Sequence, residues 1–523
     1  MRAIDYFDKG ADIDPERLAI VEGEKHFTFR EVRDLTFRVA AAMRADGLKR
    51  QEPVAIFAPN HAEVLICLLS VWRASQIWIP VNARNAIEAN VAYMNYVRVQ
   101  WLFYHSSVAE DVKELKARVP SLKRTICLDR GDLGDPLFED WVKIGARKKF
   151  AEKVDCFGNL NEVVGIFPTG GTTGPAKGVI VNNVGWGAMQ QTAHTLWSEG
   201  GVKDPVCLTT APLTHAAGPV SLAASSFGAT NVIMSGFHAG QVLRNIERHK
   251  VTHIYVPPTA LYSLLDHPGV RTHDYSSLKV MLLVGSPVSP AKLKQAVEVF
   301  GPALCQCYGQ VEAPMIMTWL PAADVAAAAR GDRPERLASC GKPTASVRMA
   351  ILDDEGNPVK EGEPGEICVR GSLVSREYFE KPEATEEAHR NGWHHTGDVG
   401  YRDADGYVYI VDRKKDMIIT GGYNVFSAEV EGVLMEMASV REAAVVGVPD
   451  ERWGEAIKAV VVKSEGANVG AEEVIAHCRA KLGGVKAPKS VEFWEDIPKT
   501  PNNKFDKKAI RAKFWGQAQR NVN

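Results

Sequence analysis

A segment rich in glycine and threonine is the first candidate for chemistry in this sequence. It reads TGGTTGPAKG at residues 169–178 and contains four glycines, three threonines and the lysine Lys177. Backbone N–H groups left accessible by glycine, threonine hydroxyls and a lysine ammonium can all bind phosphate oxygens. The segment therefore predicts a phosphate-binding loop, and the competing interpretation is the flexible tip of a hairpin.

This loop does not fit the Walker A pattern of a strand, a glycine-rich loop and a helix. That pattern requires Gly-Lys-Ser/Thr, whereas Lys177 lies three residues after Gly174 and is followed by Gly178. The flanking runs, VVGIF at 163–167 and GVIV at 178–181, are both extended patterns. We therefore expect the loop to join two strands and to bind phosphate without a helix dipole.

The elements around the loop predict an α/β fold. In the first half, helical patterns at 29–48 and 61–74 alternate with a short strand pattern at 53–60, and the same rhythm returns at 252–286. Such alternation favours largely parallel sheets covered by helices. After residue 345 the pattern changes to hairpins, which predicts a β-rich subdomain, and the last hundred residues are mixed α and β.

The composition is that of a globular protein with more than one domain. The 523 residues are 45% hydrophobic and 24% charged, with a net charge of −2, which gives no reason to expect nucleic acid as the main ligand. No secretory signal and no apolar run of membrane-spanning length are present, so we expect a cytoplasmic protein without an integral membrane segment. The nine scattered cysteines do not complete a zinc site and indicate reduced core thiols.

Taken together, these segments resemble the adenylate-forming enzymes, the superfamily of acyl-CoA synthetases, adenylation domains and luciferases. The resemblance rests on motifs that occur in order over nearly the whole chain: TGGTTGPAKG at 169–178, PLTHAAG at 212–218, VGSPVS at 284–289, YGQVE at 308–312, GEICVRG at 365–371, WHHTGD at 393–398, DRKKDMIITGGYNV at 412–425 and PKTPNNK at 498–504. It implies a two-step reaction, in which a carboxylate attacks the α-phosphate of ATP and a thiol then displaces AMP.

The resemblance also implies a domain organisation. Residues 1–412 would form the large multi-layer N-terminal domain that binds AMP and the acyl group, including the β-rich subdomain. Residues 413–415 would form a hinge in which Lys415 absorbs the dihedral change, and residues 416–523 would form a small mobile α+β domain that carries the catalytic lysine.

Three charged residues are the implied catalytic groups. The reacting carboxylate and phosphate repel each other by roughly 4 kcal/mol at 4 Å near a protein surface, so cations must lie between them. By resemblance, Lys504 bridges these two reactants, Glu312 binds Mg²⁺ and Lys177 serves the phosphates. The competing interpretation of Lys504 is a solvated member of a basic tail. Two departures from the family pattern stand out: Asn503 replaces a glycine, and Val311 replaces a hydroxyl residue before Glu312.

The resemblance further implies a nucleotide site made from several segments. Asp398 would accept the ribose hydroxyls, with a turn aspartate as the competing interpretation, and Arg413 would contact ribose or phosphate. The remaining implied contacts are Thr169, Gly170, Gly171, Thr172, Thr173 and Gly174 for phosphate, Gly285, Ser286, Pro287 and Tyr308 for adenine, and Gly309 as a further cofactor-binding residue.

Two further sets of residues concern the acid and the thiol. His215 would stand beside the acyl pocket, followed by the small residues Ala216, Ala217 and Gly218, which leave room for a bulky acyl group. No acidic residue suggests itself as a counter-ion for a substrate ammonium, so we expect a hydrophobic aromatic, alicyclic or medium-chain acid. For coenzyme A, the implied contacts are Gly422, Trp453 and Lys486, against a hairpin turn and ordinary packing as competing interpretations.

The predicted function is that of an AMP-forming carboxylate–CoA ligase that uses ATP, Mg²⁺ and coenzyme A. The main alternative is a freestanding adenylation enzyme that loads a carrier protein. A non-catalytic relative or a luciferase-like oxidase is a further alternative, which the retained Lys504, Glu312, Asp398, Arg413 and Lys177 disfavour. The oligomeric state stays open, with a homodimer as one option.

Overall fold

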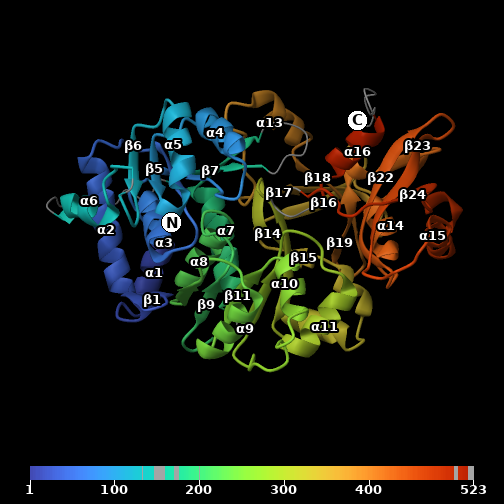
Figure 1. Cartoon of the computed structure of the whole chain (residues 1–523), viewed down its shortest axis with the longest axis horizontal. Coiled ribbons are helices and arrows are strands. Elements are labelled where there is room, and N and C mark those ends of the chain that lie inside the picture. Colours follow the sequence, from blue (N-terminus) through green and yellow to red (C-terminus); the bar gives the residue numbers. More distant parts are fainter. Residues whose placement is uncertain (132, 147–159, 170–175, 199–200, 500–504, 516–523) are drawn as a thin grey trace. The chain divides into compact units, whose positions relative to one another are not determined.

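The chain folds into two compact units, seen in a computed structural model that describes residues 1–131, 133–146, 160–169, 176–198, 201–499 and 505–515 (Figure 1). The first unit contains residues 1–169, 176–348 and 370–392. The second contains residues 349–369 and the described residues from 393 onward. The predicted hinge at 413–415 lies within the second unit, and the domain boundary at 412 stays a prediction.

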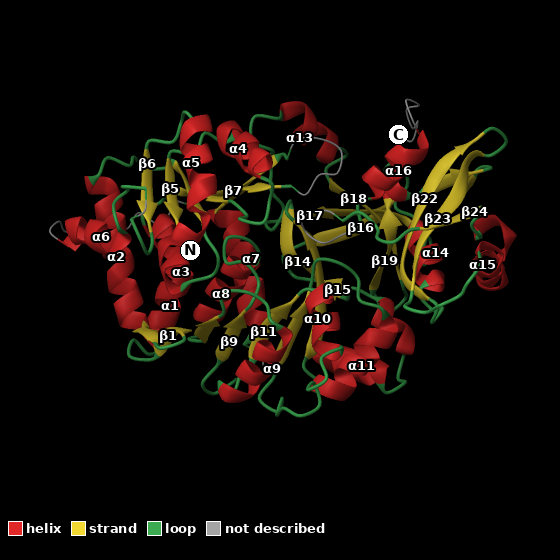
Figure 2. Ribbon diagram, viewed as in Figure 1, coloured by secondary structure: helices red, strands yellow, loops and turns green. Residues whose placement is uncertain are grey.

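One sheet of the first unit has six strands in the order β6-β5-β3-β4-β7-β8, parallel except for β8. These strands are β3 (Pro53–Phe57), β4 (Ile77–Pro80), β5 (Trp101–Tyr104), β6 (Arg124–Cys127), β7 (Val163–Pro168) and β8 (Gly178–Asn182). Their continuous apolar runs are typical of parallel strands that are covered on both faces. Helices flank the sheet (Figure 2), and they are α2 (Phe29–Ala45), α3 (Ala62–Arg73), α4 (Ile87–Tyr96), α5 (Ala109–Arg118) and α6 (Phe138–Ala146).

Local sequence explains where α2 begins and why α3 is buried. Helix α2 begins with a capping box, in which the Thr28 hydroxyl accepts from the Glu31 amide and the Glu31 carboxylate accepts from the Thr28 amide. Helix α3 confirms the helical pattern at 61–74, and eleven of its twelve residues are buried.

The second sheet of the first unit has nine strands in the order β15-β14-β13-β12-β11-β9-β10-β1-β2. The strands are β1 (Leu18–Glu22), β2 (Lys25–Thr28), β9 (Val206–Thr209), β10 (Thr230–Ile233), β11 (His253–Val256), β12 (Val280–Leu283), β13 (Leu304–Gln310), β14 (Ala313–Leu320) and β15 (Lys342–Pro343). The helices that accompany them are α1 (Asp5–Ile13), α7 (Asn183–Trp197), α8 (Ala217–Ser225), α9 (Ala239–Arg248), α10 (Pro258–Leu265), α11 (Pro290–Phe300) and α12 (Ala322–Ala329). Strands β9, β11, β12 and β13 are parallel neighbours, whereas β14 runs antiparallel to β13.

The second unit is built from hairpins and a smaller mixed layer. One sheet has the order β16-β17-β18-β19, and the other has β21-β20-β23-β22 with β24 beside β23. The strands are β16 (Arg348–Leu352), β17 (Gly365–Arg370), β18 (His394–Arg402), β19 (Val408–Arg413), β20 (Ile418–Thr420), β21 (Tyr423–Val425), β22 (Val440–Asp450), β23 (Gly454–Lys463) and β24 (Ser490–Phe493). The helices are α14 (Ser427–Leu434), α15 (Ala471–Lys486) and α16 (Lys507–Trp515), while α13 (Pro382–Ala388) belongs to the first unit.

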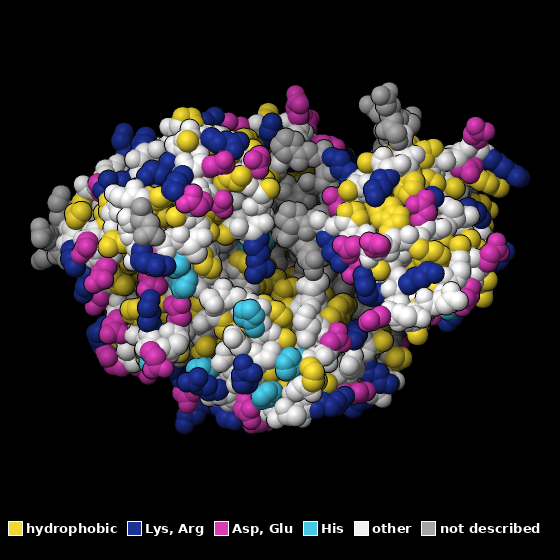
Figure 3. Space-filling view, in the orientation of Figure 1, with side chains coloured by type: hydrophobic (Ala, Val, Ile, Leu, Met, Phe, Trp, Pro, Cys, Tyr) yellow, Lys and Arg dark blue, Asp and Glu magenta, His cyan; other side chains and the backbone are white. Residues whose placement is uncertain are grey.

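This architecture confirms the predicted fold class, an α/β chain with a large multi-layer part and smaller β-rich and α+β parts. The eight described cysteines carry free thiols, and seven of them are buried. On the face shown in Figure 3, positive and negative side chains are interspersed over the first unit. Within the described residues, the helices lack the combination of length and apolar character that crossing a bilayer requires.

Candidate active site

The base of the predicted phosphate loop is closed by hydrogen bonds between its two strands. Strands β7 and β8 are antiparallel, with Pro168 opposite Gly178, which confirms that the loop joins two strands. The Thr169 amide donates to the Lys177 carbonyl at 2.9 Å, and the Lys177 amide donates to the Thr169 hydroxyl oxygen at 3.2 Å. The predicted phosphate contacts at the tip, Gly170, Gly171, Thr172, Thr173 and Gly174, lie outside the described residues.

The predicted adenine and acyl residues emerge from one edge of the nine-stranded sheet. His215 follows β9, Gly285–Pro287 follow β12, and Tyr308 lies near the end of β13. Since the carboxyl ends of parallel strands meet at one edge, these segments emerge on the same side, where α/β sheets commonly bind ligands. Tyr308 is buried, whereas Gly285, Ser286 and Pro287 are exposed.

The glycine after Tyr308 shapes the turn that carries the predicted magnesium ligand. A Cβ atom on Gly309 would lie 2.5 Å from the carbonyl carbon of Met315, so only glycine allows β13 and β14 to approach this closely. Met315 itself has a positive φ of 61°, and the ladder shifts register between Tyr308 and Gln310. The resulting tight turn between β13 and β14 holds Val311 and Glu312.

Glu312 and Lys177 meet at one tyrosine, Tyr378. The Tyr378 hydroxyl donates to Oε1 of Glu312 at 2.8 Å, and the Lys177 Nζ atom lies 5.0 Å from the centre of the Tyr378 ring. Tyr378 is 8% exposed, and burial, together with the charge of Glu312, raises its pKa, so the hydroxyl keeps its proton and remains a donor. The sequence interpretation missed Tyr378, because it lies between the motifs rather than within one.

These residues fit a bound magnesium ion. Mg²⁺ prefers oxygen ligands and is commonly held by one or two carboxylates together with phosphates and waters. Glu312 supplies such a carboxylate, and its Oε1 atom is oriented by a neutral donor. The Lys177 ammonium near the same tyrosine adds a cation for phosphate oxygens.

The small residues after His215 have a packing role, independent of the predicted acyl pocket. His215 is an exposed residue, and desolvation by the surrounding protein lowers the pKa of its ring. A Cβ atom on Gly218 would lie 2.5 Å from the Leu213 carbonyl oxygen and 2.8 Å from Leu68 Cδ2. The absence of a side chain at Gly218 therefore lets α8 pack closely, and Ala217 is buried beside it. The acyl-pocket role of Ala216 and its neighbours stays a prediction.

In the second unit, the structure brings the predicted ribose contacts together. Asp398 on β18 lies opposite Arg413 on β19, and Nε of Arg413 is 3.4 Å from Oδ1 of Asp398. The Asp398 side chain is 11% exposed and the Arg413 side chain 49%. Lys415, the predicted hinge residue, lies two positions after Arg413, and burial together with the Arg413 charge lowers its pKa.

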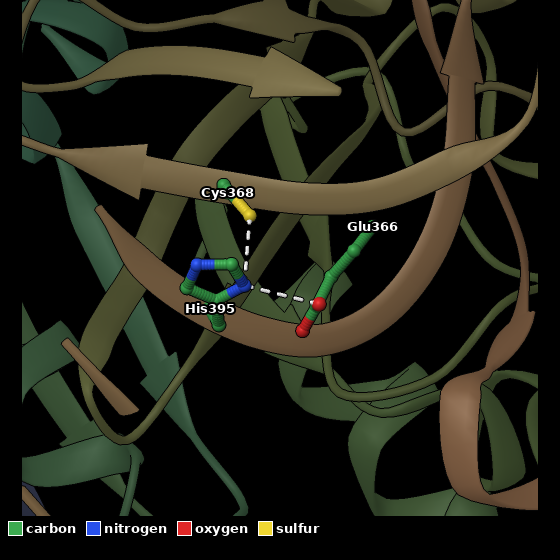
Figure 4. A group of neighbouring side chains, drawn as sticks. All are labelled: Glu366, Cys368 and His395. Atoms are coloured by element: carbon green, nitrogen blue, oxygen red, sulfur yellow. Dashed lines mark hydrogen bonds and ion pairs between the residues drawn. The ribbon is translucent and has the colours of Figure 1, made fainter. Parts of the chain in front are cut away.

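A second cluster, not anticipated from the sequence, supports the turn before Asp398 (Figure 4). The Nδ1 atom of His395 lies 3.0 Å from Glu366 Oε2 and 3.4 Å from Cys368 Sγ. Glu366 also accepts from the Gly397 amide at 3.1 Å and from Lys414 Nζ at 3.2 Å. Burial alone would raise the pKa of Glu366, but the His395 hydrogen bond and the Lys414 charge outweigh it and lower the pKa.

This cluster has donor types that bind transition metals, but its charges are already balanced. Glu366, Cys368 and His395 place one ligand atom each within 4.8 Å of one another. The Lys414 ammonium on Glu366 would repel a cation, and it makes a second ion pair with Asp354 at 2.7 Å. The cluster therefore fits a hydrogen-bonded support for residues 396–398.

Two of the predicted coenzyme A residues, Gly422 and Trp453, lie at one tight turn. Gly421 and Gly422 form the two-residue turn between β20 and β21, and their positive φ values of 58° and 81° are typical of a type I′ turn. A Cβ atom on Gly421 would lie 2.5 Å from Trp453 Cε3, whereas one on Gly422 would meet nothing within 4 Å. Trp453 is 43% exposed, and the Arg452 guanidinium lies 4.6 Å from its ring.

Two further predicted residues remain untested as ligand contacts. Lys486 donates to Glu429 Oε1 at 2.8 Å, so its ammonium is engaged in an ion pair. Lys504 and the neighbouring Asn503 lie outside the described residues, so the roles assigned to them stay predictions.

Comparisons with known proteins give matches over most of the chain. The AMP-binding enzyme family matches residues 7–379, and the AMP-binding enzyme C-terminal domain matches residues 429–504. A feruloyl-CoA synthase of an Amycolatopsis species is 35% identical over 96% of this chain and 97% of its own length. A medium/long-chain-fatty-acid–CoA ligase of Mycobacterium tuberculosis is 42% identical over 69% of this chain, and the match spans 63% of that ligase. An amide bond synthetase of Marinactinospora thermotolerans is 29% identical, with a TM-score of 0.85 over 98% of this chain and 100% of that one.

Proposed function

Because the chain belongs to the AMP-binding enzyme family and is an AMP-forming acid–thiol ligase, we propose that it adenylates a hydrophobic carboxylic acid and passes the acyl group to coenzyme A. One observation carries the proposal: Glu312 and Lys177, from segments far apart in the sequence, both contact Tyr378. A carboxylate for Mg²⁺ and a cation for phosphate at one place are what a bound nucleoside triphosphate requires.

The first half-reaction needs positive charge near the phosphates. A bound Mg²⁺ would neutralise phosphate charge, and Glu312 would hold it. Lys177 would bind phosphate oxygens at the base of the loop, while Lys504 would bridge the substrate carboxylate and the α-phosphate. Tyr308 and Gly285–Pro287 would contact adenine, and Asp398 with Arg413 would bind ribose.

The second half-reaction needs a thiol at the acyl-adenylate. Trp453 offers an exposed aromatic face beside the turn at Gly421–Gly422, and Arg452 adds a positive charge to it. An aromatic face and a guanidinium suit the nucleotide part of coenzyme A. Gly422, where an added Cβ atom would meet nothing within 4 Å, would let the pantetheine arm pass.

The acid is proposed to be hydrophobic, either aromatic, alicyclic or of medium chain length. The relatives named above act on a ferulic acid and on medium and long fatty acids, both with a large apolar part. Amines are the second class of acceptor to compare directly, because the amide bond synthetase shares the fold at 29% identity. Loading of a carrier protein is the other alternative.

Acid-dependent exchange between labelled pyrophosphate and ATP tests adenylation without any acceptor. The exchange should depend on Mg²⁺ and on one class among aromatic, alicyclic and fatty acids. Adding coenzyme A, a simple amine or an acyl carrier protein to the preferred acid then separates the acceptors. Absence of exchange with every acid would contradict the proposed activation step.

A further inference from the structure

A short segment, residues 375–379, ties the two sheets of the first unit together beside the phosphate loop. The Phe379 amide donates to the Gly178 carbonyl at 2.7 Å, and Tyr378 pairs with Val179 of β8 in an antiparallel bridge. The Ser375 amide donates to the Glu312 carbonyl at 2.7 Å, and the Ser375 hydroxyl donates to the Ile180 carbonyl at 2.7 Å. This segment thus joins the strand after the loop to the turn that carries Glu312.

The side chain of Tyr378 extends the same connection to the charged groups. Its backbone is held on both sides, and its amide also donates to the Thr385 hydroxyl oxygen at 3.0 Å. Because the backbone is fixed and the phenol has only two side-chain torsions, its ring and hydroxyl are held with little loss of conformational entropy. The hydroxyl reaches Glu312 Oε1 at 2.8 Å, and the ring face lies 5.0 Å from Lys177 Nζ.

We propose that Tyr378 is a positioning residue for the magnesium–nucleotide complex, an inference that rests on the proposed function. Its hydroxyl fixes the orientation of the Glu312 carboxylate, and its ring holds the Lys177 ammonium by a cation–π contact. The two groups act on different parts of the ligand, so the hydroxyl affects metal affinity and the ring affects phosphate affinity. If Tyr378 had a purely structural role, its substitution would lower the stability of the fold. The affinities for Mg²⁺ and for nucleotide would then keep the same ratio to each other as in the wild type.

The test compares Tyr378→Phe, which removes only the hydroxyl, with Tyr378→Leu, which also removes the ring. Tyr275→Phe is the matched control, because Tyr275 is equally buried at 8% and loses a hydroxyl that donates to the Val270 carbonyl at 2.6 Å. Binding is measured by calorimetry with α,β-methylene ATP, first without metal and then by titration of Mg²⁺ into the nucleotide complex. Melting temperatures and pyrophosphate exchange are measured on the same preparations.

The proposal predicts that Tyr378→Phe weakens Mg²⁺ binding about tenfold, in keeping with the loss of one hydrogen bond to a charged group. Nucleotide binding without metal should change less than twofold in this variant and should weaken severalfold in Tyr378→Leu. Combined with Glu312→Gln, Tyr378→Phe should cause no further loss of metal binding, because its effect acts through Glu312.

Two outcomes would overturn the inference. One is unchanged Mg²⁺ affinity in Tyr378→Phe, and the other is an equal loss in the presence and absence of Glu312. Failure of the proposed function looks different, since the wild-type enzyme itself would then show no acid-dependent exchange. If the wild type exchanges pyrophosphate and Tyr378→Phe binds Mg²⁺ normally, only the role of Tyr378 is wrong.

Discussion

Asp398 and Arg413 lie opposite each other on neighbouring antiparallel strands, with Arg413 Nε 3.4 Å from Asp398 Oδ1. The carboxylate is nearly enclosed, whereas the guanidinium is half exposed. The strand register fixes both positions, and the Glu366 cluster holds the turn that precedes Asp398. This arrangement presents an anion and a cation side by side, as the ribose hydroxyls and a phosphate of a nucleotide would require.

Asp398→Asn should therefore weaken nucleotide binding with little effect on the fold. An amide keeps the shape but replaces a charged acceptor, and hydrogen bonds to charged groups contribute about 1.5–3 kcal/mol. We expect the dissociation constant for AMP, measured by calorimetry, to rise roughly 10- to 100-fold. Asp405→Asn, in an exposed turn of the same sheet, is the control. Equal AMP affinity in Asp398→Asn and the wild type would show that Asp398 only closes the turn.

Lys504→Ala should separate the two half-reactions. Loss of the bridging ammonium should slow adenylate formation by a factor on the order of 10²–10³, the usual effect of removing one group that stabilises developing charge. Thioester formation from a supplied acyl-adenylate should change little. Lys508→Ala is the control, because Lys508 is an exposed lysine of the same basic tail. Equal losses in both half-reactions, measured by rapid quench, would contradict the role assigned to Lys504 in adenylate formation.

Glu366→Gln should destabilise the second unit in a pH-dependent way. The folded pKa of Glu366 is lowered from its ordinary value of 4.5, so its contribution is present above that pH and is lost as the pH falls through the lowered pKa. At pH 7 we expect a loss of roughly 1–3 kcal/mol and a melting temperature lower by about 5 °C.

The same experiment includes its own internal check. As the pH falls through the lowered pKa of Glu366, the wild-type carboxyl takes up a proton and resembles the amide, so the difference in melting temperature should shrink. Glu363→Gln, at an exposed position, should match the wild type throughout. A difference that stays constant from pH 7 to acidic pH would contradict an ionised Glu366 in the folded protein.

Trp453→Ala should affect only the step that uses coenzyme A. Loss of an exposed aromatic face should raise the KM for coenzyme A about tenfold, since stacking interactions contribute about 0.5–1.5 kcal/mol beyond buried area. Pyrophosphate exchange in the absence of coenzyme A should stay at the wild-type rate. Met435→Ala, which shortens another exposed apolar side chain of this unit, serves as the control. A normal KM for coenzyme A in Trp453→Ala would remove Trp453 from the proposed thiol site.

Periodicity and motif order predicted the parts of this protein that depend on neighbouring residues. The two strands around the phosphate loop, the buried helix α3 and the hairpins after residue 345 all follow local patterns. Asp398 and Arg413 belonged to separate motifs, and only the pairing of β18 with β19 showed that they meet.

Contacts between distant segments were beyond the reach of those patterns. Tyr378 and Glu312 are separated by 66 positions, and their meeting depends on a single antiparallel bridge between Tyr378 and Val179 of β8. The Glu366–His395 contact, over 29 positions, likewise depends on the register of β17 and β18. Gly218 shows that one sequence feature can have two causes. Its small size suggested space for a ligand, but the absence of a side chain also lets α8 pack closely.

The most direct measurement of the central claim is AMP release from ATP across a panel of aromatic, alicyclic, short-chain and fatty acids, with and without coenzyme A. The account predicts multiple turnovers only when a hydrophobic acid and coenzyme A are both present, with an acyl-CoA thioester formed for each AMP released. Turnover that needs the acid but ignores coenzyme A, and responds instead to an amine or a carrier protein, would contradict the assignment of coenzyme A as the acceptor.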